Sequence, residues 1–245
     1  MKKLMIGLAG AALFAGCGGS DPSTLKMITE ATFPPYEFLR GQEIVGIDVE
    51  SCRTGAEKLG KGFQCETVDF DSVIPAVISG KADLAAAGIT VTEDRKKNVD
   101  FSIPYVKTGI VVISSKSNPF TDVEQLKGKK IGVQAGTTSE NYVVNDLKQE
   151  PERLRSSAEA VAGLKAGRCD FVIADIDPAK NCVKGEADLQ LSDFITSEEY
   201  AIAIRKGRPE LLAAINATIA ELKANGKLAK WVEQYTDEAD KLKDK

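Results

Sequence analysis

The chain contains no histidine among its 245 residues. This absence excludes Ser-His-Asp and Cys-His nucleophilic catalysis, as well as zinc sites that use histidine ligands. It also removes the side chain that most often acts as a general base near neutral pH. The composition therefore counts against most hydrolases, and we expect neither a metal nor a cofactor.

Long apolar runs and a one-sided charge are also missing. After the first residues, no segment is apolar enough to span a bilayer. The 32 basic and 36 acidic residues are interspersed, so no basic patch indicates nucleic-acid binding. The remaining length of about 225 residues suits one large domain or two small lobes.

The N-terminus has the pattern of an export signal. Two lysines precede an apolar run from Leu4 to Ala15, which is too short to span a membrane. The run ends in L-F-A-G-C, which resembles a bacterial lipobox, so we expect Cys17 to become the lipidated first residue. Residues 1–16 are then a signal peptide and 17–24 a lipid-anchored tether. Ordinary secretory cleavage is the alternative.

Short apolar strands alternate with helical patterns along the rest of the chain. In the first half, the β-α-β-α-β order predicts a parallel sheet with right-handed crossovers. Asp71 is expected to cap the second helix, and Gly167 to end a later one. Residues 101–114 and 200–204 are predicted to be extended. The predicted strands are 26–29, 65–68, 84–87, 130–133, 153–155 and 171–174, and the predicted helices are 45–59, 71–79, 138–147, 158–166, 209–225 and 227–235.

A polar segment follows the strand that ends at Gly88. The run from Ala82 to Tyr105 offers the hydroxyls of Thr90 and Thr92 and then, about one helical turn later, Arg95. Backbone N–H groups at a helix start favour an anion, and a guanidinium can bind a carboxylate through two parallel hydrogen bonds. These residue types indicate a site for the α-carboxylate of an amino acid. A capped surface helix with a solvated basic face is the alternative.

Several motifs, taken in order, resemble the amino-acid-binding solute-binding proteins of bacterial ABC importers (extracellular solute-binding protein family 3). The resemblance implies an α/β, two-lobed periplasmic-binding-protein fold, in which each lobe is a mainly parallel sheet flanked by helices. A two-strand hinge near 104–109 and 199–203 would join lobe 1 (25–106 and 203–245) to lobe 2 (107–202). The motifs are F-P-P-Y-E-F, G-I-D-V-E, D-F-D-S-V-I-P-A-V, G-K-A-D-L, G-K-K-I-G-V-Q-A-G-T-T-S-E, A-G-R-C-D-F-V-I-A-D, Y-A-I-A-I-R-K-G and N-G-K-L-A-K-W.

The resemblance also implies a ligand site between the lobes, at the carboxyl ends of the strands. Arg95, Thr90 and nearby backbone N–H groups would bind the α-carboxylate of the ligand. Thr138 and Ser139 would add donors from the second lobe. Asp175 ends a strand and would bind the α-ammonium, although helix capping ahead of D-P-A is the alternative.

The ligand side chain would lie in a pocket containing Glu30. Because Arg95 and Asp175 pair with the α-groups, the carboxylate of Glu30 is left unpaired, and burying it alone is costly. We therefore expect arginine, lysine or ornithine as the ligand, with glutamine or histidine as the alternative. The Gly88 carbonyl would complete the ammonium site. For Phe33 and Phe70, which would contact the ligand, plain core packing is the alternative. The remaining implied ligand residues are Phe33, Phe70, Ala87, Gly88 and Gln134.

The expected function is extracytoplasmic binding of a free L-amino acid and its delivery to an ABC permease by lobe closure. The protein would be a monomer in the cell envelope, held by the lipid on Cys17, and not an enzyme. One alternative is a cyclohexadienyl or prephenate dehydratase-like enzyme on the same fold, with Glu30 or Asp175 as the acid. Another is a ligand-sensing domain that contacts a receptor.

Four of the five cysteines lie outside the signal region. Outside the cytoplasm, such cysteines favour disulfides. Only pairing within the lobes would leave the lobes free to move, so Cys52–Cys65 and Cys169–Cys182 are the expected bonds. Buried thiols are the alternative.

Overall fold

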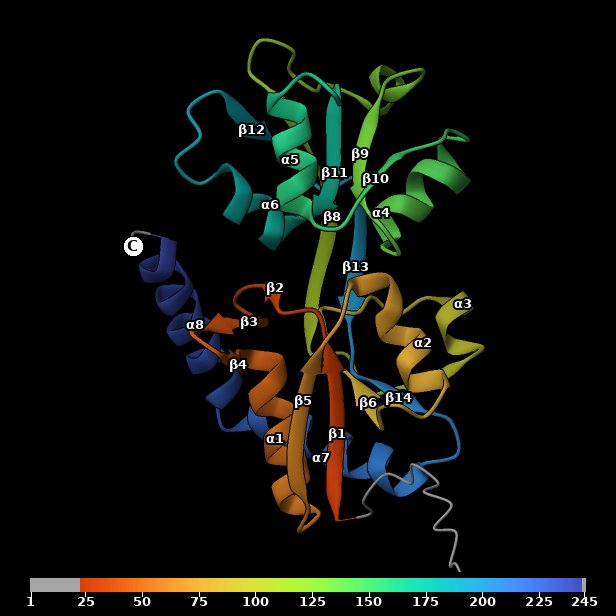
Figure 1. The fold of residues 1–245 in the computed structure, drawn as a ribbon, viewed down its shortest axis with the longest axis vertical. Coiled ribbons are helices and arrows are strands. Elements are labelled where there is room, and N and C mark those ends of the chain that lie inside the picture. The colour runs from red at the N-terminus through yellow and green to blue at the C-terminus, as the bar shows by residue number, and fades with distance from the viewer. Residues whose placement is uncertain (1–22, 244–245) are drawn as a thin grey trace, which may run out of the picture.

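The computed structural model describes residues 23–243. Two sheets with helices packed against them form two lobes, one above the other in Figure 1. This is the α/β, two-lobed architecture predicted from the sequence. The predicted signal peptide and Cys17 lie outside the described residues. The tether predicted for 17–24 overlaps the fold, because Thr24 already begins strand β1.

The lower lobe is built on a five-stranded sheet with the order β5-β1-β6-β14-β7. Strand β1 pairs in parallel with β5 and β6, which confirms the parallel arrangement predicted from the β-α-β-α-β order. Strand β14 runs antiparallel to both β6 and β7. The elements of this lobe are β1 (Thr24–Thr29), α1 (Ile47–Lys58), β5 (Gly62–Thr67), η1 (Phe70–Ser72), α2 (Val73–Ile78), β6 (Leu84–Ala85), α3 (Glu93–Lys96), β7 (Val99–Phe101), β14 (Ala203–Arg205), α7 (Pro209–Ala224) and α8 (Lys227–Lys243).

A small antiparallel sheet, β2-β3-β4, was not predicted. Its strands are β2 (Thr32–Phe33), β3 (Glu37–Arg40) and β4 (Glu43–Val45). Phe33, Tyr36 and Phe38 are buried in the core of the lower lobe, together with Trp231 of α8. This small sheet lies at the upper side of the lower lobe, beneath α6 (Ile176–Val183) in Figure 1.

The upper lobe contains a six-stranded sheet with the order β10-β9-β11-β8-β12, and β13 also pairs with β8. Strands β10, β9 and β11 are parallel, and β8 is antiparallel to β11. Gly167, with φ 72°, follows the last turn of α5 as predicted. The elements are β8 (Val106–Ser115), η2 (Val123–Leu126), β9 (Ile131–Gln134), α4 (Thr138–Asn141), η3 (Tyr142–Asp146), β10 (Glu152–Leu154), α5 (Ser157–Lys165), β11 (Phe171–Asp175), α6 (Ile176–Val183), β12 (Leu189–Leu191) and β13 (Thr196–Tyr200).

Two antiparallel strands, β8 and β13, run between the lobes (Figure 1). Their register pairs Ile110 with Thr196 and Val106 with Tyr200. The extended segment predicted for 101–114 contains most of β8, whereas the one predicted for 200–204 begins only at the last residue of β13 and runs into β14. The chain therefore passes twice between the two sheets, once in each direction.

Two local predictions need correction. Asp71 does not cap a helix: it lies inside the 3₁₀ turn η1, and α2 begins after Ser72 with no side-chain cap. The helix predicted for 138–147 is α-helical only to Asn141 and continues as a π-helix. The segment before α4 packs tightly against η1 of the lower lobe, because a Cβ added at Gly136 would come within 2.8 Å of the Asp71 Cα.

Neither predicted disulfide, Cys52–Cys65 nor Cys169–Cys182, is present within residues 23–243. Cys52 and Cys65 both pack in the lower core, and burial raises the pKa of the Cys65 thiol to about 12. This burial disfavours the thiolate that disulfide exchange requires. Cys169 precedes β11, whereas Cys182 lines a cavity beyond the other end of that strand. A disulfide needs Cα atoms within about 7 Å, and a five-residue strand is more than twice that length.

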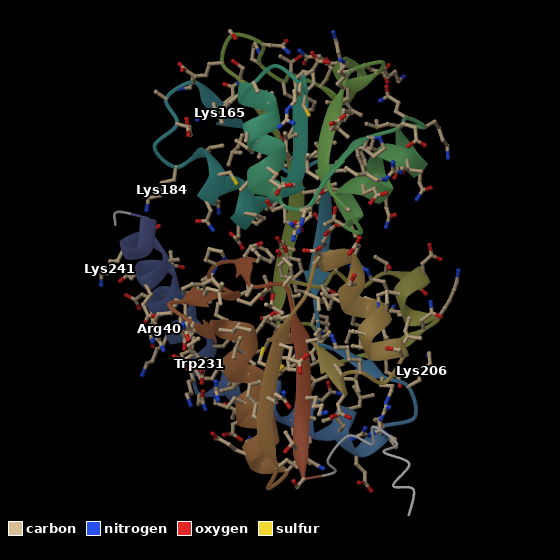
Figure 2. The ribbon with its side chains drawn as sticks, viewed as in Figure 1. Arg40, Lys165, Lys184, Lys206, Trp231 and Lys241 are labelled. Carbon is tan, nitrogen blue, oxygen red and sulfur yellow. The ribbon has the colours of Figure 1, made fainter. Side chains whose placement is uncertain are left out.

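The lobes are in contact, so the structure is a closed form. The Tyr36 hydroxyl donates to Asp177 at 2.9 Å, and the Asn181 amide donates to the Pro34 carbonyl at 2.8 Å. Lys184, after α6, lies 2.6 Å from Asp240 of α8. Figure 2 shows Lys184 at the outer edge of the upper lobe. Each contact joins the lower lobe to the upper one.

Candidate functional site

A cavity of about 360 Å³ lies between the two lobes. This volume is within the usual range for small-molecule sites. The lining comes from the carboxyl ends of β1, β6, β9 and β11 and from the segments that follow them, which is where α/β sheets bind ligands. The lining residues are Glu30, Thr32, Phe33, Pro34, Phe70, Ala87, Gly88, Thr90, Arg95, Gln134, Thr137, Thr138, Ser156, Ser157, Ala158, Asp175, Pro178, Asn181 and Cys182.

The structure brings every predicted ligand residue except Ser139 to this cavity. Ser139 lies in the first turn of α4, its side chain is buried, and its hydroxyl has no hydrogen-bond partner among the described residues. The sequence placed both Thr138 and Ser139 at a helix start, but consecutive helical residues point about 100° apart. Only Thr138 therefore faces the ligand cavity.

Arg95 is the one cationic residue in the described lining of the cavity. Its guanidinium donates to the Thr90 carbonyl at 2.8 Å and to the Gly136 carbonyl of the other lobe at 3.0 Å. It also lies over the Phe70 ring, 5.7 Å from the centroid. Burial lowers the pKa of Arg95, whereas the nearby Asp175 and Glu198 carboxylates raise it. An arginine retains its charge under such conditions and can bind a carboxylate here.

Asp175 is the last residue of β11, and one of its oxygens accepts a hydrogen bond from the Tyr200 hydroxyl at 2.8 Å. Burial, followed by the Glu198 charge, raises the pKa of Asp175 to about 7, while Tyr200 and Arg95 oppose the shift. A carboxylate with so little solvation gains from a positively charged partner. The alternative role of helix capping is not seen, because the Asp175 side chain makes no cap hydrogen bond to α6.

Glu30 follows β1 directly and is 7% exposed. Burial raises the pKa of Glu30, and hydrogen bonds from Thr32 and Gln134 oppose that shift. The described lining therefore carries two carboxylates, Glu30 and Asp175, and one cation. With both carboxyl groups ionised, the lining carries one net negative charge, and Glu30 is the acid that lacks the Arg95 interaction of Asp175.

Gly88 contacts a buried pair of acidic residues, Asp48 and Glu37, which lies behind the cavity wall. Its φ of 54° is unfavourable for other residues, and an added Cβ would come 2.1 Å from the Phe33 ring. The Gly88 N–H donates to Asp48 at 3.1 Å, and the Tyr105 hydroxyl donates to the same oxygen at 2.7 Å. Burial, followed by the nearby Asp48 charge, raises the pKa of Glu37 well above its usual range.

Some lining residues were missed by the sequence reasoning. Pro178, Asn181 and Cys182 belong to α6, which the D-P-A sequence after Asp175 indicated only as a possible helix start. Ser156 caps α5 through its hydroxyl, a pattern that the serine pair before this helix could have revealed. Within residues 23–243, no cluster of acidic or cysteine side chains could hold a metal ion.

The comparisons with known proteins agree with this geometry. The model of the bacterial extracellular solute-binding proteins, family 3, matches residues 25–238. The chain belongs to this family. The resemblance inferred from the sequence motifs is therefore confirmed.

Two kinds of relatives in family 3 are informative. The arginine-binding extracellular protein ArtP of Bacillus subtilis (strain 168) is 34% identical over 94% of this chain and 96% of its own length. A solved structure of an ancestral arginine-binding protein bound to arginine is 40% identical, with a TM-score of 0.79, over 87% of this chain and 98% of that one. An ancestral arginine-binding protein bound to glutamine is 39% identical, with a TM-score of 0.79, over 88% and 99%.

Membership of family 3 makes this an amino-acid-binding type of solute-binding protein. No helix among residues 23–243 is both long and apolar enough to cross a bilayer. The two-lobed fold corresponds to the fold of the solved relatives.

Proposed function

We propose that the protein binds a free basic L-amino acid, with arginine the first candidate and lysine and ornithine next. The observation that supports this most directly is the charge of the cavity: two carboxylates, Glu30 and Asp175, and one cation, Arg95. The α-carboxylate would pair with Arg95 and the α-ammonium with Asp175. A cationic side chain would then neutralise Glu30, whose burial is costly without a partner.

The same proposal includes delivery to an ABC permease. The cavity is lined from both lobes, so a bound ligand would contact the two together and favour the closed form. In this proposal the two lobes move relative to each other, with lobe 1 formed by 25–106 and 203–245 and lobe 2 by 107–202. We further propose a monomeric, extracytoplasmic protein anchored through Cys17, without catalytic activity.

The Glu30→Gln variant tests the choice of a basic ligand. Removing the charge should weaken arginine binding by about 1.5–3 kcal/mol, the range for hydrogen bonds to charged groups. Glutamine carries no side-chain charge, so its affinity should change by much less. Isothermal titration calorimetry with both amino acids measures the difference.

A matched control is Glu124→Gln, which removes one negative charge at a side chain that is 76% exposed and pairs with Lys127. This control should bind both ligands like the wild type. Equal losses of arginine and glutamine affinity in Glu30→Gln would show that Glu30 does not select the ligand, and the glutamine alternative would then be favoured.

A further inference from the structure

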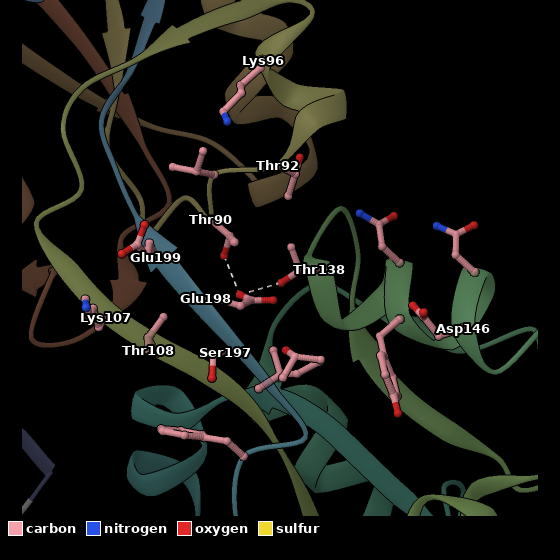
Figure 3. A pocket seen from close by; sticks show the side chains of 17 residues that line it. Thr90, Thr92, Lys96, Lys107, Thr108, Thr138, Asp146, Ser197, Glu198 and Glu199 are labelled. Atoms are coloured by element: carbon pink, nitrogen blue, oxygen red, sulfur yellow. Dashed lines mark hydrogen bonds between the residues drawn. The ribbon is translucent and has the colours of Figure 1, made fainter.

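Glu198 lies on the hinge strand β13 and contacts one threonine from each lobe. Its Oε2 accepts a hydrogen bond from Thr90 Oγ1 at 2.6 Å and another from Thr138 Oγ1 at 3.0 Å. Figure 3 shows the three side chains meeting at the hinge, with both hydrogen bonds dashed. Thr90 belongs to the lower lobe and Thr138 to α4 of the upper lobe. A single carboxylate oxygen therefore links both lobes to the hinge.

The same three residues lie between two cavities. Thr90 and Thr138 line the ligand cavity and also a larger rear cavity of about 910 Å³, whereas Glu198 lines only the rear one. Glu198 thus approaches the two hydroxyls from behind the ligand site. Backbone contacts fix this approach, because Thr90 bridges to Tyr200 and the Val91 N–H donates to the Glu199 carbonyl at 3.0 Å.

This arrangement determines what the two hydroxyls can offer to a ligand. A threonine hydroxyl has one hydrogen and two lone pairs, and an ionised carboxylate can only accept. Because each hydrogen is directed to Glu198, Thr90 and Thr138 present only lone pairs to the ligand cavity. Such acceptors suit the α-ammonium. This differs from the role expected from the sequence, in which Thr90 and Thr138 would bind the α-carboxylate, because that group needs donors, which Arg95 and backbone N–H groups supply.

We propose that Glu198 is a positioning residue of the amino-acid site, which holds Thr90 and Thr138 together across the closed lobes and directs their lone pairs to the ligand ammonium. This inference rests on the proposed amino-acid binding and assigns a role to a residue that does not touch the ligand. The Thr90 hydrogen bond joins the lower lobe to β13, which belongs to the same upper sheet unit as Thr138, so this bond crosses between the two proposed moving units. Glu198 therefore also stabilises the closed form before any ligand binds.

Calorimetry on three variants tests this role with the wild-type ligand. Glu198→Ala should weaken arginine binding about tenfold, the loss expected when a charge-assisted hydrogen bond is removed. Glu198→Gln keeps an oxygen that can accept both hydrogen bonds, so it should restore affinity to within about threefold of the wild type. The neighbouring Glu199→Ala is the matched control, because Glu199 is exposed on the same strand and should leave binding unchanged.

A double-mutant cycle shows whether Glu198 acts through a threonine. Thr138→Val keeps the shape of the side chain and removes its hydroxyl. If Glu198 acts through this hydroxyl, the combined loss in Glu198→Ala/Thr138→Val should be clearly smaller than the product of the two single losses. The proposal would be overturned if the combined loss equalled the product of the single losses. It would also be overturned if Glu198→Ala bound arginine as well as the wild type or more tightly, or if Glu198→Ala and Glu198→Gln lost affinity equally.

Small-angle X-ray scattering of the unliganded protein separates this proposal from the function on which it rests. Unliganded Glu198→Ala should have a larger radius of gyration than the wild type, because its lobes open more readily. An identical radius of gyration in the two proteins would contradict the proposal that Glu198 stabilises the closed form. If the wild type binds no amino acid at all, the proposed function fails, and the scattering experiment still decides whether Glu198 holds the lobes together.

Discussion

Replacing Arg95 by alanine should weaken amino-acid binding by about 2–5 kcal/mol, the range found when one partner of a buried charge pair is removed. Arg95 is the cation of the described cavity lining, and its guanidinium also donates to Gly136 of the opposite lobe. Its loss would leave the ligand carboxylate without a counter-charge and would remove one contact of the closed form. Calorimetry with arginine, and with lysine as a second ligand, measures the effect.

Arg53→Ala provides a closely matched control. Arg53 also lies over a phenylalanine ring of the lower lobe, 4.9 Å from the Phe63 centroid, but it does not line the cavity. It should bind arginine like the wild type. Unchanged affinity in a folded Arg95→Ala variant would mean that the α-carboxylate binds elsewhere, and the assignment of the site would be wrong.

Asp175→Asn should weaken binding to a similar extent, yet it should not destabilise the unliganded protein. The asparagine oxygen can still accept the Tyr200 hydrogen bond, so the local geometry is retained. The charge that pairs with the α-ammonium is lost, whereas the cost of burying an ionised carboxylate is also removed. Calorimetry and thermal unfolding at pH 8 should therefore give opposite results: weaker binding and equal or greater stability. A loss of stability with unchanged affinity would make Asp175 a purely structural residue.

The pH dependence of wild-type binding follows from the same residue. Because burial raises the pKa of Asp175 to about 7, the unliganded protein holds a proton there that an ammonium ligand must displace. Arginine affinity should fall about tenfold per pH unit below 7. The stability of the unliganded protein should change in the opposite direction. Between pH about 4 and 7 the folded state binds more protons at Asp175 than the unfolded state does, so the free energy of unfolding falls as the pH rises through that window.

Glu30→Gln distinguishes the two acids of the cavity. It retains Asp175, so its arginine affinity should still decline below pH 7 as in the wild type. A pH-independent affinity in Glu30→Gln would assign the titration to Glu30 instead.

The fold was largely accessible from the sequence because its signals are local. Short apolar strands such as Phe171–Asp175 alternate with helices, and this order alone requires parallel pairing and places the strand ends at one edge. Asp175 could be located from its position after F-V-I-A. The β2–β4 hairpin was missed because each strand has only two to four residues, too few for an alternating pattern.

The rest of the site depends on contacts between distant parts of the chain. Glu198 lies 108 residues from Thr90 and 60 from Thr138, and nothing in the polar T-S-E-E-Y segment distinguishes it from Glu199. Ser139 was misplaced because a helix start does not specify which of two neighbouring hydroxyls faces the cavity. The cysteines are close in sequence within each lobe, but the packing of Cys169 and Cys182 at different ends of β11 could not be inferred from spacing.

The central claim is that the cavity binds a basic amino acid, and thermal unfolding of the refolded protein with the twenty amino acids, ornithine and prephenate tests it most directly. Unfolding and refolding remove any ligand carried through purification. A ligand at one hundred times its dissociation constant adds about 2.7 kcal/mol of stability, which gives a clear rise in melting temperature. We predict such a rise with arginine, lysine or ornithine. A rise confined to glutamine, histidine or prephenate, or no rise with any of these compounds, would contradict the account.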